Sequence, residues 1–112
     1  MKLPSPIPMD LAEMIAARLR VIGDPNRIRI LDQLRDGELS VAQITDRLDT
    51  SQQNASKHLG VLLQAGIVAR RKEGTSSFYS VADQGVYELC EQVCGGLQTQ
   101  LAELTALVEG TG

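Results

Sequence analysis

The sequence predicts a mainly α-helical domain with a β-hairpin wing, the winged helix-turn-helix fold class, and three observations lead to it. Between residues 40 and 66, a short helical pattern, a tight turn and a second helix with a polar front follow one another. Residues 67–81 place two apolar, strand-prone stretches around a polar tip centred on glycine, which is typical of a hairpin. Residues 83–108 return to helical spacing.

Length and composition limit the chain to one small domain. With 112 residues it can build a single core, and aliphatic side chains must fill that core because only 3% of the residues are aromatic. No run of about 18 apolar residues predicts a membrane span, and the N-terminus lacks the apolar region of a signal peptide. We therefore expect a cytoplasmic protein, with residues 1–9 as a proline-rich extended arm and residues 10–109 as the folded domain.

Charge is distributed unevenly along the chain. Residues 1–72 carry all eleven Lys and Arg residues and eight of the fourteen acids, so this part has a net charge of +3. Residues 73–112 carry the other six acids and no Lys or Arg, which gives −6. The basic front can meet an anionic partner even though the whole chain has a net charge of −3.

Helix-start signals place the first two helices. Asp10 with Glu13 predicts a capping box, and an apolar stripe follows at helical spacing: Leu11, Met14, Ile15, Leu19 and Ile22. Asp24 is the expected cap of the second helix, Pro25 suits its first position and Gly37 suits its stop. The inward residues expected for this helix are Ile28, Leu31 and Leu34.

The next two helices form the predicted helix-turn-helix. Ser40 with Gln43 predicts a second capping box, which opens a short helix whose apolar residues are Val41, Ile44 and Leu48. After the brief turn of residues 49–51, Ser51 is the natural cap of the following helix, which runs to Gly66. Its inward residues are expected to be Ala55, Leu59, Leu62 and Leu63.

The hairpin and a long helix complete the chain. The apolar residues that flank the polar tip of the hairpin are Ile67, Val68, Phe78, Tyr79 and Val81. The apolar stripe of the last helix consists of Val86, Cys90, Val93, Leu97, Leu101, Leu104 and Val108. This stripe is too long for a core of this size to cover, so we expect it to form an interface.

The front of the helix that follows Ser51 is rich in side chains that donate and accept hydrogen bonds. In a helix-turn-helix, the second helix enters the major groove with its N-terminal residues toward the base edges. Amides can pair with adenine, hydroxyls serve either role and Lys reaches guanine or phosphate. The candidate DNA contacts are Ser51, Gln52, Gln53, Asn54, Ser56 and Lys57. A merely solvated helix front is the alternative, against which the preceding turn and the basic hairpin argue.

The hairpin adds a second group of candidate contacts. Arg70, Arg71 and Lys72 lead into a tip that includes Thr75 and Ser76. Such a wing would lie along phosphates or in a minor groove, where Arg is favoured. The alternative is a charged, solvated edge strand that protects the sheet from aggregation. Three adjacent cations beside a candidate recognition helix favour DNA.

Two motifs connect these elements to a known family. Residues 51–68 fit S-x-x-x-x-S-x-H-L-x-x-L-x-x-A-G-[IV]-[IV], and residues 71–74 fit an R-x-E-G wing. With them the chain resembles the ArsR/SmtB family of bacterial winged-helix repressors over roughly residues 10–108. The resemblance implies a homodimer that binds an inverted repeat in double-stranded DNA and releases it when an effector binds. It also implies that His58 helps to seat the recognition helix.

The same resemblance implies that the dimer forms through the first and last helices. The interface residues expected on this basis are Leu11, Met14, Ile15, Val93, Leu97, Leu101 and Leu104.

Two sensor patterns of the family are absent from the sequence. Members with a metalloid site carry E-L-C-V-C-[DE]-L in the third helix, whereas this chain has ELSVAQI, with Ser40 and Ala42 where the cysteines would stand. Members with a zinc site on the last helix carry Asp/His and His/Glu pairs there. The only histidine of this chain is His58, in the recognition helix, which argues against zinc binding through imidazole.

Cys90 and Cys94, the only cysteines, lie four residues apart on one face of the last helix and form the candidate effector site. As thiolates they could offer soft ligands to a thiophilic metal or metalloid ion, or they could be oxidised or persulfidated. Both also fit the apolar stripe as small packed residues. Gly95 and Gly96 follow directly and suit a close helix approach or a kink.

The sequence favours a dimeric, effector-responsive DNA-binding repressor over other classes of protein. It contains no paired His and acid set, no Gly-rich phosphate loop and no nucleophile motif, so we do not expect an enzyme. Two alternatives stay open. One is a winged-helix module that binds proteins instead of DNA, and the other is a repressor without an effector, whose cysteines are structural.

Overall fold

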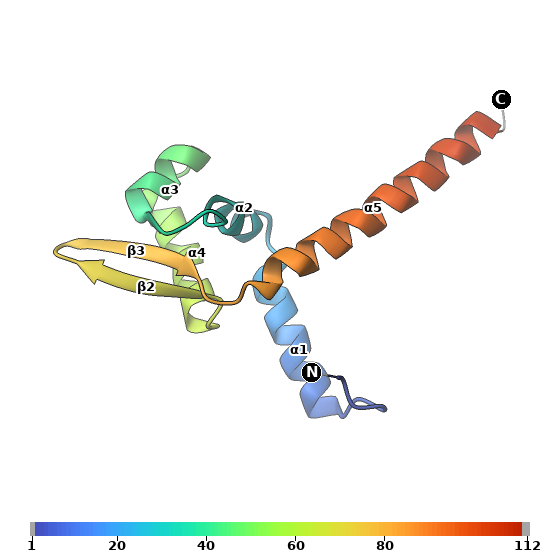
Figure 1. Cartoon of the computed structure of the whole chain (residues 1–112), viewed down its shortest axis with the longest axis horizontal. Coiled ribbons are helices and arrows are strands. Elements are labelled where there is room, and N and C mark those ends of the chain that lie inside the picture. Colours follow the sequence, from blue (N-terminus) through green and yellow to red (C-terminus); the bar gives the residue numbers. More distant parts are fainter. Residues whose placement is uncertain (1, 111–112) are drawn as a thin grey trace.

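Five helices and three strands make up the computed structural model, which describes residues 2–110 (Figure 1). In chain order they are α1 (Met9–Ile22), α2 (Pro25–Gln33), β1 (Leu39–Ser40), α3 (Val41–Leu48), α4 (Gln52–Gln64), β2 (Val68–Glu73), β3 (Ser76–Val81) and α5 (Gly85–Gly110). The predicted fold class, mainly helical with a hairpin wing, is confirmed. Within the described part, no helix combines the length and the apolar character that a membrane crossing needs.

The N-terminal segment differs slightly from the predicted boundaries. Residues 2–8 contain no helix or strand, and Met1 of the expected arm lies outside the described residues. The predicted capping box of α1 is wrong, because α1 begins at Met9 and Asp10 already lies in its first turn. Pro8 occupies the cap position with a φ of −63° and a ψ of 150°, so the chain enters the helix from an extended proline without a side-chain cap.

Side-chain caps fix the starts of the next three helices, as predicted. The Asp24 carboxylate accepts two backbone N–H groups at the start of α2, at 2.9 and 3.1 Å. The bond from the Arg27 N–H is the main cause that holds the pKa of Asp24 below its ordinary value. Ser40 and Gln43 form the reciprocal capping box of α3, and the Ser51 hydroxyl accepts a backbone N–H of α4 at 3.0 Å.

The three strands form one antiparallel sheet in the order β1-β3-β2. A two-residue turn with Gly74 at a φ of 62° closes the hairpin, a conformation that favours glycine. The sequence does not predict β1, because two residues are too few to show an alternating pattern. β1 places Leu39 opposite Tyr79 and so ties the segment just before α3 to the wing.

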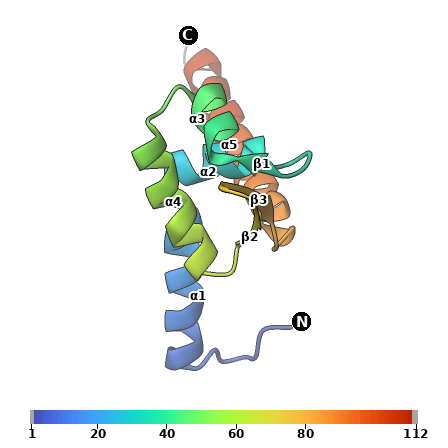
Figure 2. The ribbon, with the colours of Figure 1, turned by 90° about the vertical axis from the view of Figure 1, so that its left-hand side faces the viewer.

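The core lies beneath α4. Ala55, Leu59 and Leu62 are fully buried on one side of this helix and belong to the same apolar cluster as Ile44 of α3 and Ile67 before β2. In Figure 2, α4 lies to one side of the strands. Burial of these three side chains fixes the rotation of α4 and therefore decides which of its residues face solvent.

One inward position predicted for α2 is wrong. Leu31 and Leu34 are buried, but Ile28 remains 41% exposed. The contacts of α2 with α3 and α4 cover only one edge of its apolar stripe. Ile28 lies on the other edge and lines a groove that α1 and α5 also border.

Arg18 joins three separate parts of the fold. Its Nη1 donates to the backbone carbonyl of Ala65 at 2.9 Å, and its Nη2 pairs with the Asp83 carboxylate at 2.7 Å. The hydrogen bond from Arg18 holds the pKa of Asp83 below its ordinary value. These contacts attach α1 to the end of α4 and to the segment that leads into α5.

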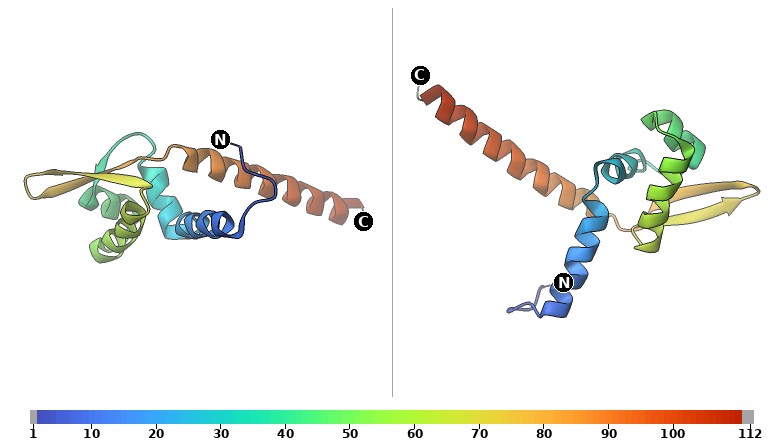
Figure 3. Two further views of the ribbon diagram at one scale, coloured as in Figure 1. Left: turned by 90° about the horizontal axis from the view of Figure 1, so that it is seen from below. Right: turned by 180° about the vertical axis from the view of Figure 1, so that it is seen from behind.

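α5 projects from the body on the side opposite the hairpin (Figures 1 and 3). Its 26 residues span about 39 Å, and only Val86 among them is buried. The radius of gyration is 17.8 Å, whereas a compact domain of this length has about 13 Å. As predicted, the apolar stripe outruns the core, and its exposed large residues are Val93, Leu97, Leu101, Leu104 and Val108.

Leu59 and Gly60 are neighbours in α4, one buried and one exposed, and provide a matched test of its orientation. Leu59→Ala should lower the free energy of unfolding by about 2–5 kcal/mol, because it empties a fully buried position. Gly60→Ala should raise it by about 1 kcal/mol, since Gly60 is exposed and an added Cβ meets no atom within 4 Å. Urea unfolding followed by circular dichroism measures both changes. Similar losses in the two variants would contradict this orientation.

Candidate nucleic-acid interface

α4 turns a polar face to solvent. Because Ala55, Leu59 and Leu62 are held inside, the period of 3.6 residues sends the intervening positions outward. The exposed residues on this face are Gln52, Gln53, Ser56, Lys57 and Gly60. α4 contains no acidic residue, so Lys57 gives this face a positive charge next to the N-terminal end of the helix dipole.

Two other predicted contacts, Ser51 and Asn54, are engaged within the chain. The Ser51 hydroxyl accepts the capping hydrogen bond of α4 and retains its own proton for donation. Asn54 is half-buried, and its side-chain amide nitrogen donates to the Thr50 hydroxyl at 2.9 Å. Asn54 therefore braces the turn between α3 and α4 and lies at the edge of the polar face instead of its centre.

His58 lies on the inner side of α4, where it is 8% exposed. Its Nδ1 is 3.2 Å from Nη1 of Arg27, and because a guanidinium can only donate, Nδ1 is the acceptor in this contact. Nε of Arg27 also donates to the Val21 carbonyl at 2.6 Å. His58 thus connects α4 to the junction of α1 and α2, a position suited to seating the helix.

Alternation along β2 separates the three wing cations. Arg70 lies opposite Tyr79, whose buried side chain marks the core side of the hairpin, and Lys72 shares that side. β2 contacts α4, so this is the side nearer the candidate recognition helix. Arg71 points to the other side, together with its cross-strand partner Phe78.

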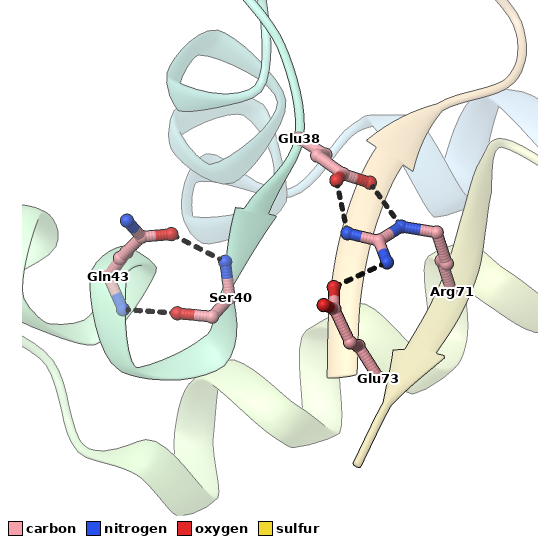
Figure 4. A network of polar contacts seen from close by, with 5 residues as sticks. All are labelled: Glu38, Ser40, Gln43, Arg71 and Glu73. Atoms are coloured by element: carbon pink, nitrogen blue, oxygen red, sulfur yellow. Dashed lines mark hydrogen bonds and ion pairs between the residues drawn. The ribbon is translucent and has the colours of Figure 1, made fainter. Parts of the chain in front are cut away.

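Arg71 is enclosed by two carboxylates (Figure 4). Its Nη2 and Nε bind the two oxygens of Glu38 at 2.6 and 3.2 Å, and its Nη1 binds Glu73 at 2.7 Å. The guanidinium carbon lies 4.8 Å from the centroid of the Phe78 ring. The bond to Arg71 lowers the pKa of Glu38, and the bond to Glu38 raises the pKa of Arg71, so both stay charged.

The outer wing keeps exposed cations. Arg70 and Lys72 are exposed and form no hydrogen bond or ion pair within residues 2–110. Thr75 and Ser76 stand exposed at the tip. Arg70, Lys72 and the tip residues are therefore available to a partner. Arg71 instead belongs to a cluster with two carboxylates, which the sequence did not predict.

Cys90 and Cys94 line an apolar groove of about 320 Å³ between α5 and the junction of α1 and α2. Cys90 is half-buried, Cys94 is exposed, and both are free thiols. The other lining residues are Leu19, Ile22, Gly23, Ile28, Leu89, Val93 and Leu97. Within residues 2–110, no three His, Cys, Asp or Glu side chains gather as a metal-binding group.

Comparison with known proteins places these features in context. The family model of a helix-turn-helix domain matches residues 22–71. The chain is 41% identical over 86 residues to an uncharacterized helix-turn-helix transcriptional regulator of Methanocaldococcus jannaschii, which covers 76% of this chain and 97% of that protein. It is 34% identical over 80 residues to the transcriptional repressor SmtB of Mycobacterium tuberculosis, with 71% of this chain and 59% of that protein covered.

Solved structures show the same fold. The homodimeric winged helix-turn-helix DNA-binding domain Mb0332 of Mycobacterium bovis, described as a possible ArsR-family transcriptional regulator, superposes with a TM-score of 0.70 at 28% identity. The match covers 88% of this chain and 91% of that one.

Proposed function

Because the chain belongs to the ArsR/SmtB family of winged helix-turn-helix transcriptional regulators, we propose that it is a dimeric repressor, which binds an inverted-repeat operator and releases it when an effector acts at Cys90 and Cys94. The observation that carries the DNA-binding part is the exposed, acid-free polar face of α4 beside two unpaired wing cations. Dimerisation and effector release rest on separate observations.

The polar face of α4 suits the reading of base edges. Gln52 and Ser56 are four residues apart and lie in one row along the helix, and Gln53 and Lys57 form a second row. An amide offers a donor and an acceptor together, which adenine matches in the major groove. Arg70 and Lys72, with the tip hydroxyls, would then hold the neighbouring phosphates and set the register.

A second copy of the chain is the partner proposed for α5. Leu97, Leu101, Leu104 and Val108 repeat at alternating four- and three-residue intervals, the spacing of helices that pack side by side. The three leucines are 60%, 64% and 53% exposed, a cost that burial against a like stripe removes. Residues of α1 would complete the interface, namely Leu11, Met14 and Ile15. The Mycobacterium bovis relative is described as a homodimer.

The groove beside Cys90 and Cys94 supports these residues as the effector site. Its walls come from α1, α2 and α5, and α2 contacts both α3 and α4. A ligand or a covalent change in this groove would alter the packing of α5, the proposed dimer helix. It would also alter the packing of α2, which supports α4, the proposed recognition helix. The candidate effectors are a thiophilic metal or metalloid ion, with ligands shared between two chains, and a thiol-reactive oxidant or sulfur species.

Gln52→Ala and Gln53→Ala should each reduce sequence discrimination by about 1–3 kcal/mol, since each removes a bidentate partner for a base edge. The measurement is competition between a duplex selected by the wild-type protein from a random library and scrambled duplexes, by fluorescence anisotropy at fixed salt. Gln64→Ala, an exposed amide at the other end of α4, is the control and should leave discrimination unchanged. Unaltered preference in both test variants would refute the proposed docking of α4.

Leu101→Glu should convert the protein into monomers and abolish operator binding, because it places a charge in the proposed α5 seam. Sedimentation velocity at micromolar concentration measures the first effect and anisotropy measures the second. Ala102→Glu adds the same carboxylate one residue away, on an exposed side of α5 that faces away from the stripe, and should leave the dimer intact. A wild-type protein that sediments as a monomer would rule out this assembly.

The Cys90→Ser, Cys94→Ser double variant should keep its operator affinity and lose effector-dependent release. Release is tested with Cd²⁺, with an organic persulfide and with an oxidant, and for the wild-type protein it should weaken binding by about 5–150-fold. If release persists in the variant, the cysteines only pack and the sensor lies elsewhere.

A further inference from the structure

We propose that Arg71 is a positioning residue of the wing and not a phosphate contact: with Glu38 and Glu73 it fixes the hairpin against the start of the helix-turn-helix, so that Arg70 and Lys72 can meet DNA. This inference rests on the proposed DNA-binding function. It assigns different roles to three adjacent cations that look equivalent in the sequence.

The guanidinium of Arg71 has little left to offer a phosphate. All three of its nitrogens bind carboxylate oxygens, at 2.6, 2.7 and 3.2 Å, and one of its flat faces is directed at Phe78. One positive charge is shared by two carboxylates, so the cluster has a net charge of −1 at neutral pH. A phosphate that approached it would meet repulsion.

The direction of the side chain gives a second, independent argument. Arg71 lies on the side of the hairpin that carries Phe78, whereas Arg70 and Lys72 lie on the side of the buried Tyr79. One rigid wing cannot present both sides to the same DNA backbone. The cations next to α4 are therefore the ones that reach the phosphates of a site read by α4.

The cluster connects the wing to the helix-turn-helix. Glu38 directly precedes β1, and Ser40 of β1 is the cap of α3 (Figure 4). β1 pairs with β3 through only two residues, Leu39 and Ser40. The bidentate bond from Arg71 to Glu38 adds a third attachment, at the residue just before β1, between the wing and the segment that starts α3.

Glu38→Gln separates the two roles by the sign of its effect. If Arg71 positions the wing, loss of the carboxylate weakens binding to the duplex selected by the wild-type protein, even though a negative charge near DNA is removed. We expect a loss of about threefold or more, the size of coupling within such ion-pair networks. Asp36→Asn is the matched control, because it removes an exposed acid from the same loop. The Asp36 side chain forms no hydrogen bond or ion pair within residues 2–110. This control should bind as well as the wild type or slightly better.

The salt dependence of DNA binding distinguishes a positioning role from a phosphate contact, because only the loss of a phosphate contact changes it. Arg71→Ala and Arg71→Lys should weaken binding to a similar extent, because Lys lacks the bidentate fork, and both should keep the wild-type slope of log K against log salt. Arg70→Ala should lower the magnitude of that slope by about 0.9, the value for one phosphate. Urea midpoints of all variants confirm that each is folded under the binding conditions.

Several outcomes would overturn the inference. Tighter binding by Glu38→Gln than by Asp36→Asn, or equal binding by the two, would show that Glu38 masks Arg71 or is irrelevant to it. The inference would also fail if Arg71→Ala lowered the slope of log K against log salt while Arg71→Lys bound DNA like the wild type. The proposed function fails in a different way, since the wild-type protein would then select no duplex and Arg70→Ala would change nothing.

Discussion

The burial of one side of α4 is the constraint on which the rest of the structure depends. Ala55, Leu59 and Leu62 have no exposed surface and His58 has little, so the helix has one orientation in which its apolar side chains are covered. In that orientation the two rows of polar side chains face solvent, and no additional contact is needed to direct them outward. The same burial sets the position of β2, which starts soon after α4 and contacts it, so the wing is placed by the core that places the helix.

Arginine side chains hold the parts that this small core does not reach. Arg18 attaches α1 to the end of α4, Arg27 attaches the α1–α2 junction to His58, and Arg71 attaches the wing to the segment before α3. Each of them bonds to a carbonyl, ring nitrogen or carboxylate more than 30 residues away in the sequence. A guanidinium suits this task because its rigid fork makes several directed bonds at once. The links made by Arg18 and Arg27 join α1 and the α1–α2 junction, which border the groove beside Cys90 and Cys94, to α4.

The long helix α5 makes the fold elongated, and its exposed apolar stripe is the surface on which the proposed second copy packs. A single core cannot cover a helix of about 39 Å, and an uncovered stripe of leucines is costly in water. The groove that contains Cys90 and Cys94 lies where α5 leaves the body, between the buried first turn and the exposed remainder of the helix. The two thiols therefore lie at the junction between the body and the exposed part of α5.

Local signals in the sequence determined the helix caps at Asp24, Ser40 and Ser51, the inner side of α4 and the hairpin, because capping and periodicity depend on residues within a few positions of one another. The exposure of Ile28, the strand β1 and the division of the wing cations needed the tertiary structure. Arg71 and Lys72 are neighbours of the same chemical type in the sequence. Strand alternation and a glutamate 33 residues away decide that one is enclosed by carboxylates and the other is free. Such a pairing depends on the register of the sheet and on the path of the chain between its partners, and neither is encoded in a local pattern.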